Sequence, residues 1–282
     1  MNQVAITDMI QDVDGLEAMP VSIKKLADVA ANPNARIDDI VEAIRYDQAL
    51  TADLLRAANS AWSGAARTIE TVQQAVVRLG FSWVLGLMTG KHVRRKMVEP
   101  CAAYQLAEKE LWRHSLAAAL AASKMGSVAE KEIPPSAFTV ALMHDIGKRV
   151  LANYLDTDLV NRIFTLIQEG MCYIDAEREV LGTDHAIVGG MVARHWQFPE
   201  TFINAIEHHH DPDAEPCVML DVVHVANIVA KILGIGLGTE QMNMACSDSA
   251  VARLGISSEG LESLCAITLE ELQKTEGLFE TA

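Results

Sequence analysis

The chain has few aromatic residues, no long apolar run and no closely spaced pair of cysteines. Only 5% of its 282 residues are Phe, Trp or Tyr, although half of the sequence is hydrophobic. The apolar residues are mainly Ala, Leu, Val and Ile, a composition that suits packed helices better than a β-sandwich. No apolar stretch approaches the roughly 18 residues of a membrane span, so we expect no transmembrane helix and no membrane partner.

Cysteine usage points to a reducing compartment. The five cysteines are scattered, and no two of them form a CxxC pair. This pattern is typical of free thiols and not of a disulfide framework or a zinc knuckle. The first residues also lack the basic start and apolar core of a secretion signal. The sequence therefore predicts a soluble, cytoplasmic protein.

Positive charge is scarce. The chain has 23 Lys and Arg residues against 38 Asp and Glu residues, which gives a formal net charge of −15 at pH 7. Such a surface repels nucleic acid, so we expect no nucleic-acid partner. The one dense basic run, Lys91 to Lys96, has two interpretations: a site for an anionic nucleotide or acidic partner, or an ordinary solvated helix end.

The N-terminal region shows short helices separated by turn signals. Apolar residues recur at three- and four-residue spacing over 21–31, which predicts a helix there. Asp38 and Asp47 are placed to cap the next two helices, and Thr71 with Gln74 forms the pattern of a capping box. We find no convincing strand and no internal repeat, so the predicted fold class is all-α.

Longer helices are expected after Pro100. The periodicity predicts them over 110–124, 158–168, 174–180, 185–195, 199–209 and 220–233. The predicted organisation is an N-terminal helical subdomain (residues 1–99), a helical bundle (100–235) and a C-terminal helical appendage (236–282).

Several histidines occupy helices or helix ends of this bundle. They are His114 in mid-helix, His144 beside Asp145 at the end of an apolar helix, His185 at a helix start, and His209 with His210 at a helix end. Imidazole and carboxylate ligands suit iron, manganese, zinc or nickel, and the helices of a bundle can each project such ligands inward. Glu110 lies four residues before His114, on the same helix face.

Each histidine alone has an ordinary explanation. His114 is consistent with a core histidine, His185 with a plain helix start, and His209 with a helix end complemented by positive charge. The group as a whole, with His144-Asp145-Ile-Gly-Lys148, favours a site for one or two divalent ions.

Two N-terminal segments add a family resemblance. The segment Asp47–Trp62 (DQALTADLLRAANSAW) and the segment Ile69–Arg78, together with His144-Asp145, resemble the HDOD (HD-related output domain) family of the HD superfamily of metal-dependent phosphohydrolases. The resemblance covers roughly residues 13 to 235. It implies an HD-domain-like helical bundle with an additional N-terminal helical subdomain, in a protein of bacterial signal transduction.

The resemblance also implies a ligand set. The superfamily pattern places a first ligand at His114 and the signature pair at His144 and Asp145. The related HD-GYP phosphodiesterases add further ligands that correspond to Glu110, His185, His209 and His210. The last ligand, an Asp in the superfamily, falls at Asn227, a weaker ligand for which His224 is a candidate substitute. The Gly-Tyr-Pro segment of the cyclic-di-GMP hydrolases is absent here, which disfavours that reaction.

Two functions remain open at this stage. In the first, the chain is a regulatory module that binds a signalling partner, and its metal is structural or sensory. In the second, it is a metal-dependent phosphohydrolase acting on a small phosphorylated ligand. Asp145 would then orient the metal, and Lys148 would offset phosphate charge, although Lys148 also fits a solvated lysine past a helix end. Asn227 and the HDOD-like N-terminal region favour the regulatory module; the oligomeric state stays open.

Overall fold

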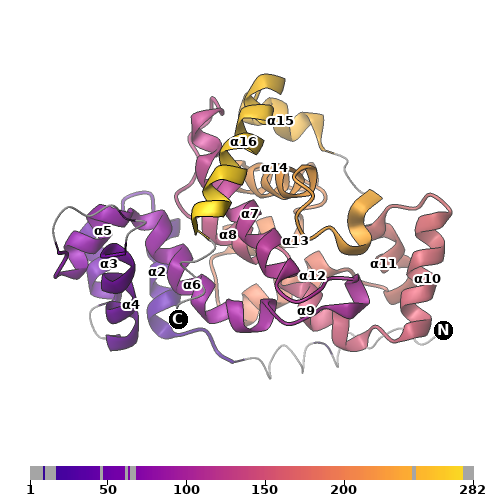
Figure 1. The fold of residues 1–282 in the computed structure, drawn as a ribbon, viewed down its shortest axis with the longest axis horizontal. Coiled ribbons are helices and arrows are strands. Elements are labelled where there is room, and N and C mark those ends of the chain that lie inside the picture. Colours follow the sequence, from indigo (N-terminus) through magenta and orange to yellow (C-terminus); the bar gives the residue numbers. More distant parts are fainter. Residues whose placement is uncertain are drawn as a thin grey trace.

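The computed structural model describes residues 9, 17–44, 47–60, 63, 68–242 and 246–275. Within these ranges the chain is built from helices, and the pairing of Cys101 with Leu106 is an isolated bridge and not a strand (Figure 1). The all-α prediction is therefore confirmed. Ala61 and Trp62, which end one of the two resemblance segments, lie outside the described residues.

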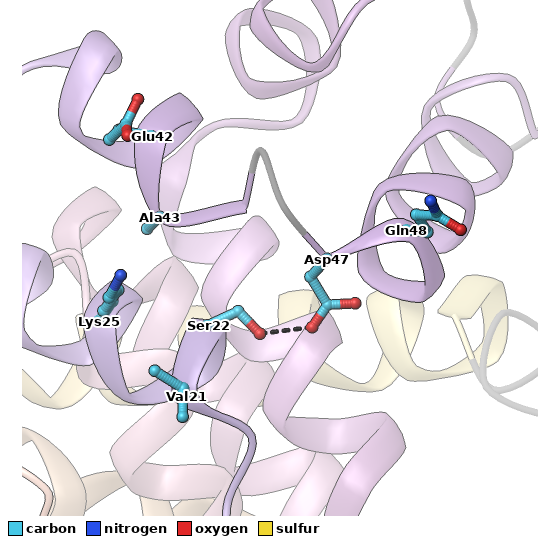
Figure 2. Close-up of a pocket in the computed structure, with 7 residues that line it drawn as sticks. All are labelled: Val21, Ser22, Lys25, Glu42, Ala43, Asp47 and Gln48. Atoms are coloured by element: carbon cyan, nitrogen blue, oxygen red, sulfur yellow. Dashed lines mark hydrogen bonds between the residues drawn. The ribbon is translucent and has the colours of Figure 1, made fainter.

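Four helices gather at one end of the molecule (Figure 1). They are α2 (Val21–Ala31), α3 (Ile37–Ile44), α4 (Gln48–Ala58) and α5 (Val72–Leu79). Asp47 links two of them, because its Oδ1 accepts the backbone N–H of Leu50 at the start of α4 (3.0 Å) and its Oδ2 accepts the hydroxyl of Ser22 on α2 (2.5 Å). Figure 2 shows this contact beside a surface pocket. The predicted cap at Asp47 is confirmed.

The other predicted caps have different outcomes. Thr71 and Gln74 form the complete capping box at the start of α5. The prediction for Asp38 is wrong, because α3 already begins at Ile37 and Asp38 lies inside its first turn. A carboxylate there still interacts favourably with the positive end of the helix dipole, but it cannot act as the N-cap.

Helix α6 (Phe81–Met97) joins the N-terminal helices to the rest of the fold. It packs against α2, α4 and α5 on one side and against α7 (Glu110–Lys124) and α8 (Ala137–Met143) on the other. The ring of Phe138 lies directly on its backbone, since a Cβ added at Gly86 would come within 2.1 Å of that ring. The additional N-terminal subdomain is thus present, while the exact boundaries at residues 99 and 235 stay predictions.

Six helices form the central bundle. Its members are α7, α8, α9 (Gly147–Leu151), α12 (His185–His195), α13 (Glu200–Glu207) and α14 (Val218–Ile232). Helix α7 packs on α8 and α14, and α12 packs on α9 and α13. The bounds predicted for α7 and α12 are confirmed. The bounds predicted for α13 and α14 differ from those of the structure by one or two residues at each end.

Close approach of α9 and α12 depends on Gly147. A Cβ at this position would lie 2.0 Å from the carbonyl oxygen of His185 and 2.5 Å from the backbone nitrogen of Gly189. Only a residue without a side chain permits that crossing. The crossing brings Asp145, which lies between α8 and α9, within 3.4 Å of Nε2 of His185 at the start of α12.

Two pairs of helices cover the bundle. α10 (Thr157–Gln168) and α11 (Tyr173–Leu181) lie at one end, and α15 (Asp248–Leu254) and α16 (Ser258–Thr275) pack on α14 and α7 (Figure 1). Short 3₁₀ turns lie in four of the connections between consecutive helices of the fold: η2 (Ala102–Tyr104), η3 (Met125–Ser127), η4 (Ala152–Tyr154) and η5 (Gly238–Met242). Among the described residues, no helix has both the length and the apolar character to cross a membrane.

The contact between α6 and α8 makes a prediction about stability. We expect Gly86→Ala to lower the free energy of unfolding by about 1–3 kcal/mol, because the new methyl group overlaps the buried ring of Phe138. Urea denaturation followed by circular dichroism measures the change. Gly260→Ala on α16 is the matched control: its Cβ has ordinary contacts of 3.4 Å or more, so the higher helix propensity of Ala should raise stability. Equal effects of the two substitutions would contradict the prediction.

Candidate metal centre

Four histidines and one aspartate meet inside the central bundle. His114 comes from α7, His144 and Asp145 follow α8, His185 begins α12, and His209 follows α13. Each of the five side chains is at most 2% exposed. The fold therefore brings together residues that are up to 95 positions apart in the sequence.

Asp145 lies at the middle of this cluster. Its Oδ2 is 3.3 Å from Nε2 of His144 and 3.6 Å from Nε2 of His114. Its Oδ1 is 3.4 Å from Nε2 of His185 and 3.7 Å from Nε2 of His209. Each carboxylate oxygen thus faces one pair of imidazole nitrogens, an arrangement in which a single carboxylate can contact two ions.

The outer nitrogen of each ring is held by an acceptor. Nδ1 donates a hydrogen bond in every case: His114 to the carbonyl of Ile235 (2.8 Å), His144 to that of Ala141 (2.7 Å), His185 to Oε2 of Glu177 (2.7 Å) and His209 to the carbonyl of Ile206 (2.7 Å). A neutral imidazole that donates through Nδ1 carries its lone pair on Nε2. All four Nε2 atoms lie 3.3 to 3.7 Å from an oxygen of Asp145, and outer acceptors of this kind orient the histidines of metal sites.

The Nε2 atoms of His144 and His209 face the carboxylate and no hydrogen-bond donor. Nε2 of His144, Nε2 of His209 and Oδ1 of Asp145 are buried without a hydrogen-bond partner. Buried acceptors that face one another are unfavourable unless a positive charge lies between them. A divalent cation would satisfy all three atoms, and the set of nitrogen and oxygen donors fits iron, manganese, zinc or nickel.

The protonation states agree with this arrangement. Burial lowers the pKa of His114 to about 4 and lowers the pKa of His209 well below its usual value. Burial alone would raise the pKa of Asp145, but its neighbours His144 and Lys148 bring that pKa well below the usual range. Near neutral pH His114 and His209 are therefore neutral and Asp145 is ionised, which are the forms that bind metal. His185 differs: burial alone would lower its pKa, but the carboxylate of Glu177 beside Nδ1 raises that pKa above its usual value.

Two further predicted ligands flank the cluster. Oδ1 of the buried Asn227 lies 3.1 Å from Nε2 of His114. At the other side, Nε2 of the half-buried His210 lies 2.9 Å from Nε2 of His185. The potential ligand atoms of the described residues form three groups in which all atoms lie within 4.8 Å of one another. The first contains His114, His144 and Asp145, and the second contains His185, His209 and His210. The third, with Asp145, His185 and Glu240, shares a residue with each of the other two.

Glu110 is not brought into the cluster. It is the first residue of α7, and its Oε2 accepts the backbone N–H of Ala107 at 2.7 Å. The carboxylate therefore satisfies the start of its own helix, where free N–H groups attract acidic side chains. We remove Glu110 from the candidate ligand set.

His224 is not a substitute for a carboxylate at position 227 either. Its Nδ1 donates to the carbonyl of His209 (2.8 Å), and its Nε2 accepts the backbone N–H of Ser247 (3.0 Å). Both ring nitrogens are thus used in tying the backbone after α13 to the chain before α15. The expectation that His224 compensates for Asn227 is wrong.

Three charged residues near the cluster, Glu177, Glu240 and Lys231, were not predicted from the sequence. Glu177 on α11 holds His185, and it also accepts the hydroxyl of Tyr104 (2.7 Å). Glu240 on η5 pairs with Lys148 and Lys231, at 2.6 and 2.7 Å. Glu177 and Glu240 lie on elements that carry none of the histidines, so no local signal singles them out. Lys231 does have such a signal, since it lies four residues after Asn227 on α14 and therefore on the same helix face.

Lys148 itself is buried and not solvated. It is 4% exposed, and its Nζ lies 2.7 Å from Oδ2 of Asp145. The interpretation of Lys148 as a solvated lysine past a helix end is therefore wrong.

The basic run at 91–96 is partly neutralised by acidic partners. Nζ of Lys91 lies 2.8 Å from Asp53, and Arg95 lies 2.7 Å from Glu17. The guanidinium of Arg94 lies over the ring of Trp112. These contacts favour the interpretation of the run as an ordinary helix surface with local ion pairs. They disfavour its interpretation as a dedicated site for an anion.

Comparisons with known proteins place these observations in context. The HDOD domain matches residues 16–212 of the chain. An uncharacterized protein of Treponema pallidum (strain Nichols) is 26% identical over 242 residues, or 81% of this chain. The match covers 44% of that relative, so the chain spans less than half its length.

Two solved structures share the fold. One is a candidate phosphohydrolase of Shewanella amazonensis SB2B, 25% identical, with a TM-score of 0.62; the match covers 96% of this chain and 95% of that one. The other is a candidate signal transduction protein of Marinobacter aquaeolei VT8, 18% identical, with a TM-score of 0.74, covering 100% of this chain and 67% of that one.

The different contacts of His224 and His209 lead to a prediction. We expect His224→Ala to lower the free energy of unfolding by about 1–3 kcal/mol, because a carbonyl and an N–H lose their partner. The metal content of the purified protein should stay at the wild-type value, whereas His209→Ala should reduce it. Urea denaturation and elemental analysis measure the two effects. Loss of metal from the His224 variant would contradict the assignment of His224 as structural.

Proposed function

The chain belongs to the HDOD family, and on this premise we propose that it is a bacterial regulatory protein whose helical bundle binds one or two divalent metal ions. The observation that supports this most directly is the set of four Nε2 atoms that surround Asp145. Three buried atoms of the cluster have no hydrogen-bond partner, and a bound cation would provide one.

In the proposed site, Asp145 is shared between two groups of ligands. His114 and His144 would hold an ion at Oδ2, and His185, His209 and His210 would hold an ion at the Oδ1 side. A divalent ion at either place lowers the pKa of a bound water and polarises a phosphoryl oxygen. Glu177, Ile206 and Ala141 supply the outer hydrogen bonds that fix the rings.

The regulatory role rests on two features of the chain. Asn227, a neutral amide, lies beside His114 where the superfamily has a carboxylate, which reduces the negative charge available to hold a second ion. Glu240, bound by two lysines, fills space next to His185 that a substrate would need. Both features favour a metal that has a structural or sensory role, with a signalling partner or a small phosphorylated ligand as the regulated contact.

Metal content tests the proposed site. We expect purified wild-type protein to retain one or two divalent ions per chain, and Asp145→Asn to lose most of them, because this isosteric change removes the charge that both groups share. Elemental analysis gives the content. Asp158→Asn on the exposed surface of α10 is the control and should keep the wild-type content. Equal metal content in wild type and Asp145→Asn would contradict the proposal.

A metal-dependent phosphohydrolase is the second candidate function. The observation that favours it is the buried ammonium of Lys148 at 2.7 Å from Asp145, where it could neutralise phosphate charge. Enzymes of this type use metal ions and cationic side chains together to stabilise the charge of a transferring phosphoryl group. A panel of phosphoesters with added manganese or iron distinguishes the two functions: turnover that disappears in Asp145→Asn supports the enzyme.

Asn227 provides a specific test of what limits this site. We expect Asn227→Asp to increase affinity for Mn²⁺ by about tenfold or more, because a carboxylate replaces an amide 3.1 Å from His114 Nε2. Isothermal titration of metal-stripped protein measures the affinity. Asp175→Asn, at an exposed position on α11, is the control and should leave the Mn²⁺ affinity of the metal-stripped protein unchanged. Unchanged affinity in Asn227→Asp would show that the missing carboxylate does not limit metal binding.

A further inference from the structure

Glu240 reaches the centre from a segment that follows the bundle. It lies on η5 and is 3% exposed. Its Oε1 is 2.6 Å from Nζ of Lys148, and its Oε2 is 2.7 Å from Nζ of Lys231. Oε1 is also 3.7 Å from Nε2 of His185. One carboxylate is therefore held at both oxygens by ammonium groups, beside a proposed metal ligand.

The two lysines form a buried site for an anion. Lys148 and Lys231 are 4% and 2% exposed. A buried ammonium requires an anionic partner, because its desolvation is otherwise uncompensated. Asp145 provides one for Lys148, and Glu240 provides the one that Lys231 contacts.

Glycines hold the Glu240 segment in place. Gly236 and Gly238 both have positive φ, at +56° and +50°. A Cβ at Gly236 would lie 2.5 Å from the carbonyl oxygen of Glu110, and a Cβ at Gly238 would lie 2.2 Å from that of Tyr104. The segment is thus seated against α7 and η2, and the position of Glu240 is a feature of the packed fold.

We propose that Lys148 and Lys231 form a binding site for a phosphate group and that Glu240 occupies this site as an internal competitor. A phosphate offers two oxygens to two ammonium groups in the same way as the carboxylate of Glu240. The ligand class is inorganic phosphate or a phosphate monoester. This inference deepens the proposed function, because a phosphate bound here would lie beside His185 and Asp145, next to the proposed ions.

A cavity lies next to the same segment. It has a volume of about 210 Å³ and is lined by Thr239, which adjoins Glu240, and by Tyr173. The ring of Tyr173 lies 6.5 Å from that of His185. Thr239 is the residue of this segment that lines the cavity, so the cavity adjoins the chain next to Glu240.

Inorganic phosphate is the probe for the test. We expect Glu240→Gln in the full chain to bind phosphate about tenfold or more tightly than wild type, because the change keeps the shape of the side chain and removes a like charge from the anion site. Isothermal titration calorimetry measures the affinity. Adding Lys231→Met to this variant should abolish the gain. Glu271→Gln is the matched control, since Glu271 on α16 also contacts two lysines, Lys124 and Lys274, outside the cluster.

A second variant covers the case in which Glu240→Gln does not fold. Glu240→Asp keeps the charge but shortens the side chain, so it should hold the two lysines less well and give a smaller gain in phosphate affinity. Equal phosphate affinity in wild type and in the folded position-240 variants would overturn the inference. Loss of metal without a gain in phosphate affinity would also overturn it and identify Glu240 as a metal ligand.

Metal content measured on the same samples separates this inference from the proposed function. A wild-type protein that holds no metal would overturn the proposed function. The phosphate titration of the Glu240 variants would still decide the inference, because the lysine site requires no ion to bind phosphate.

Discussion

The buried carboxylate of Asp145 is the constraint on which the site depends. An isolated charge in the interior is strongly unfavourable, so the surrounding fold must supply compensation. Lys148 supplies part of it directly at 2.7 Å. The four histidines hold their Nδ1 atoms against outer acceptors and place their Nε2 atoms within 3.7 Å of the same carboxylate. The Nε2 atoms of His144 and His209 have no hydrogen-bond partner there, which is consistent with a cation beside Asp145.

Charges alternate outward from Asp145 through three elements. Asp145 contacts Lys148 on α9, Lys148 contacts Glu240 on η5, and Glu240 contacts Lys231 on α14. The chain after α14 is therefore electrostatically part of the centre, although the sequence suggested a separate appendage. Any change that moves η5 alters the charge next to Lys148, which provides a physical connection between the C-terminal helices and the proposed metal site.

Local signals were sufficient for the helices and for part of the site. The bounds of α7 and α12 and the caps at Asp47 and Thr71 follow from spacing within a few residues, and the structure confirms them. The ligand candidates at Glu110 and His224 failed for a different reason. Each lies near a backbone group that its side chain satisfies first, and spacing along a helix does not show such competition. The pairing of Glu240 with Lys231 could not be predicted, because it depends on how a glycine-containing turn packs against α7 and η2.

The balance of charge bears on the number of ions. Asp145 and Glu240 are each ionised, and Lys148 and Lys231 balance them, so these four groups have no net charge. Glu177 adds one negative charge behind His185, and Asn227 adds none. A first divalent ion would therefore enter a cluster with little excess negative charge, and a second would meet the repulsion of the first without a further carboxylate to offset it. On this argument a second ion would need a further negative group beside it, which a bound anion such as phosphate would supply.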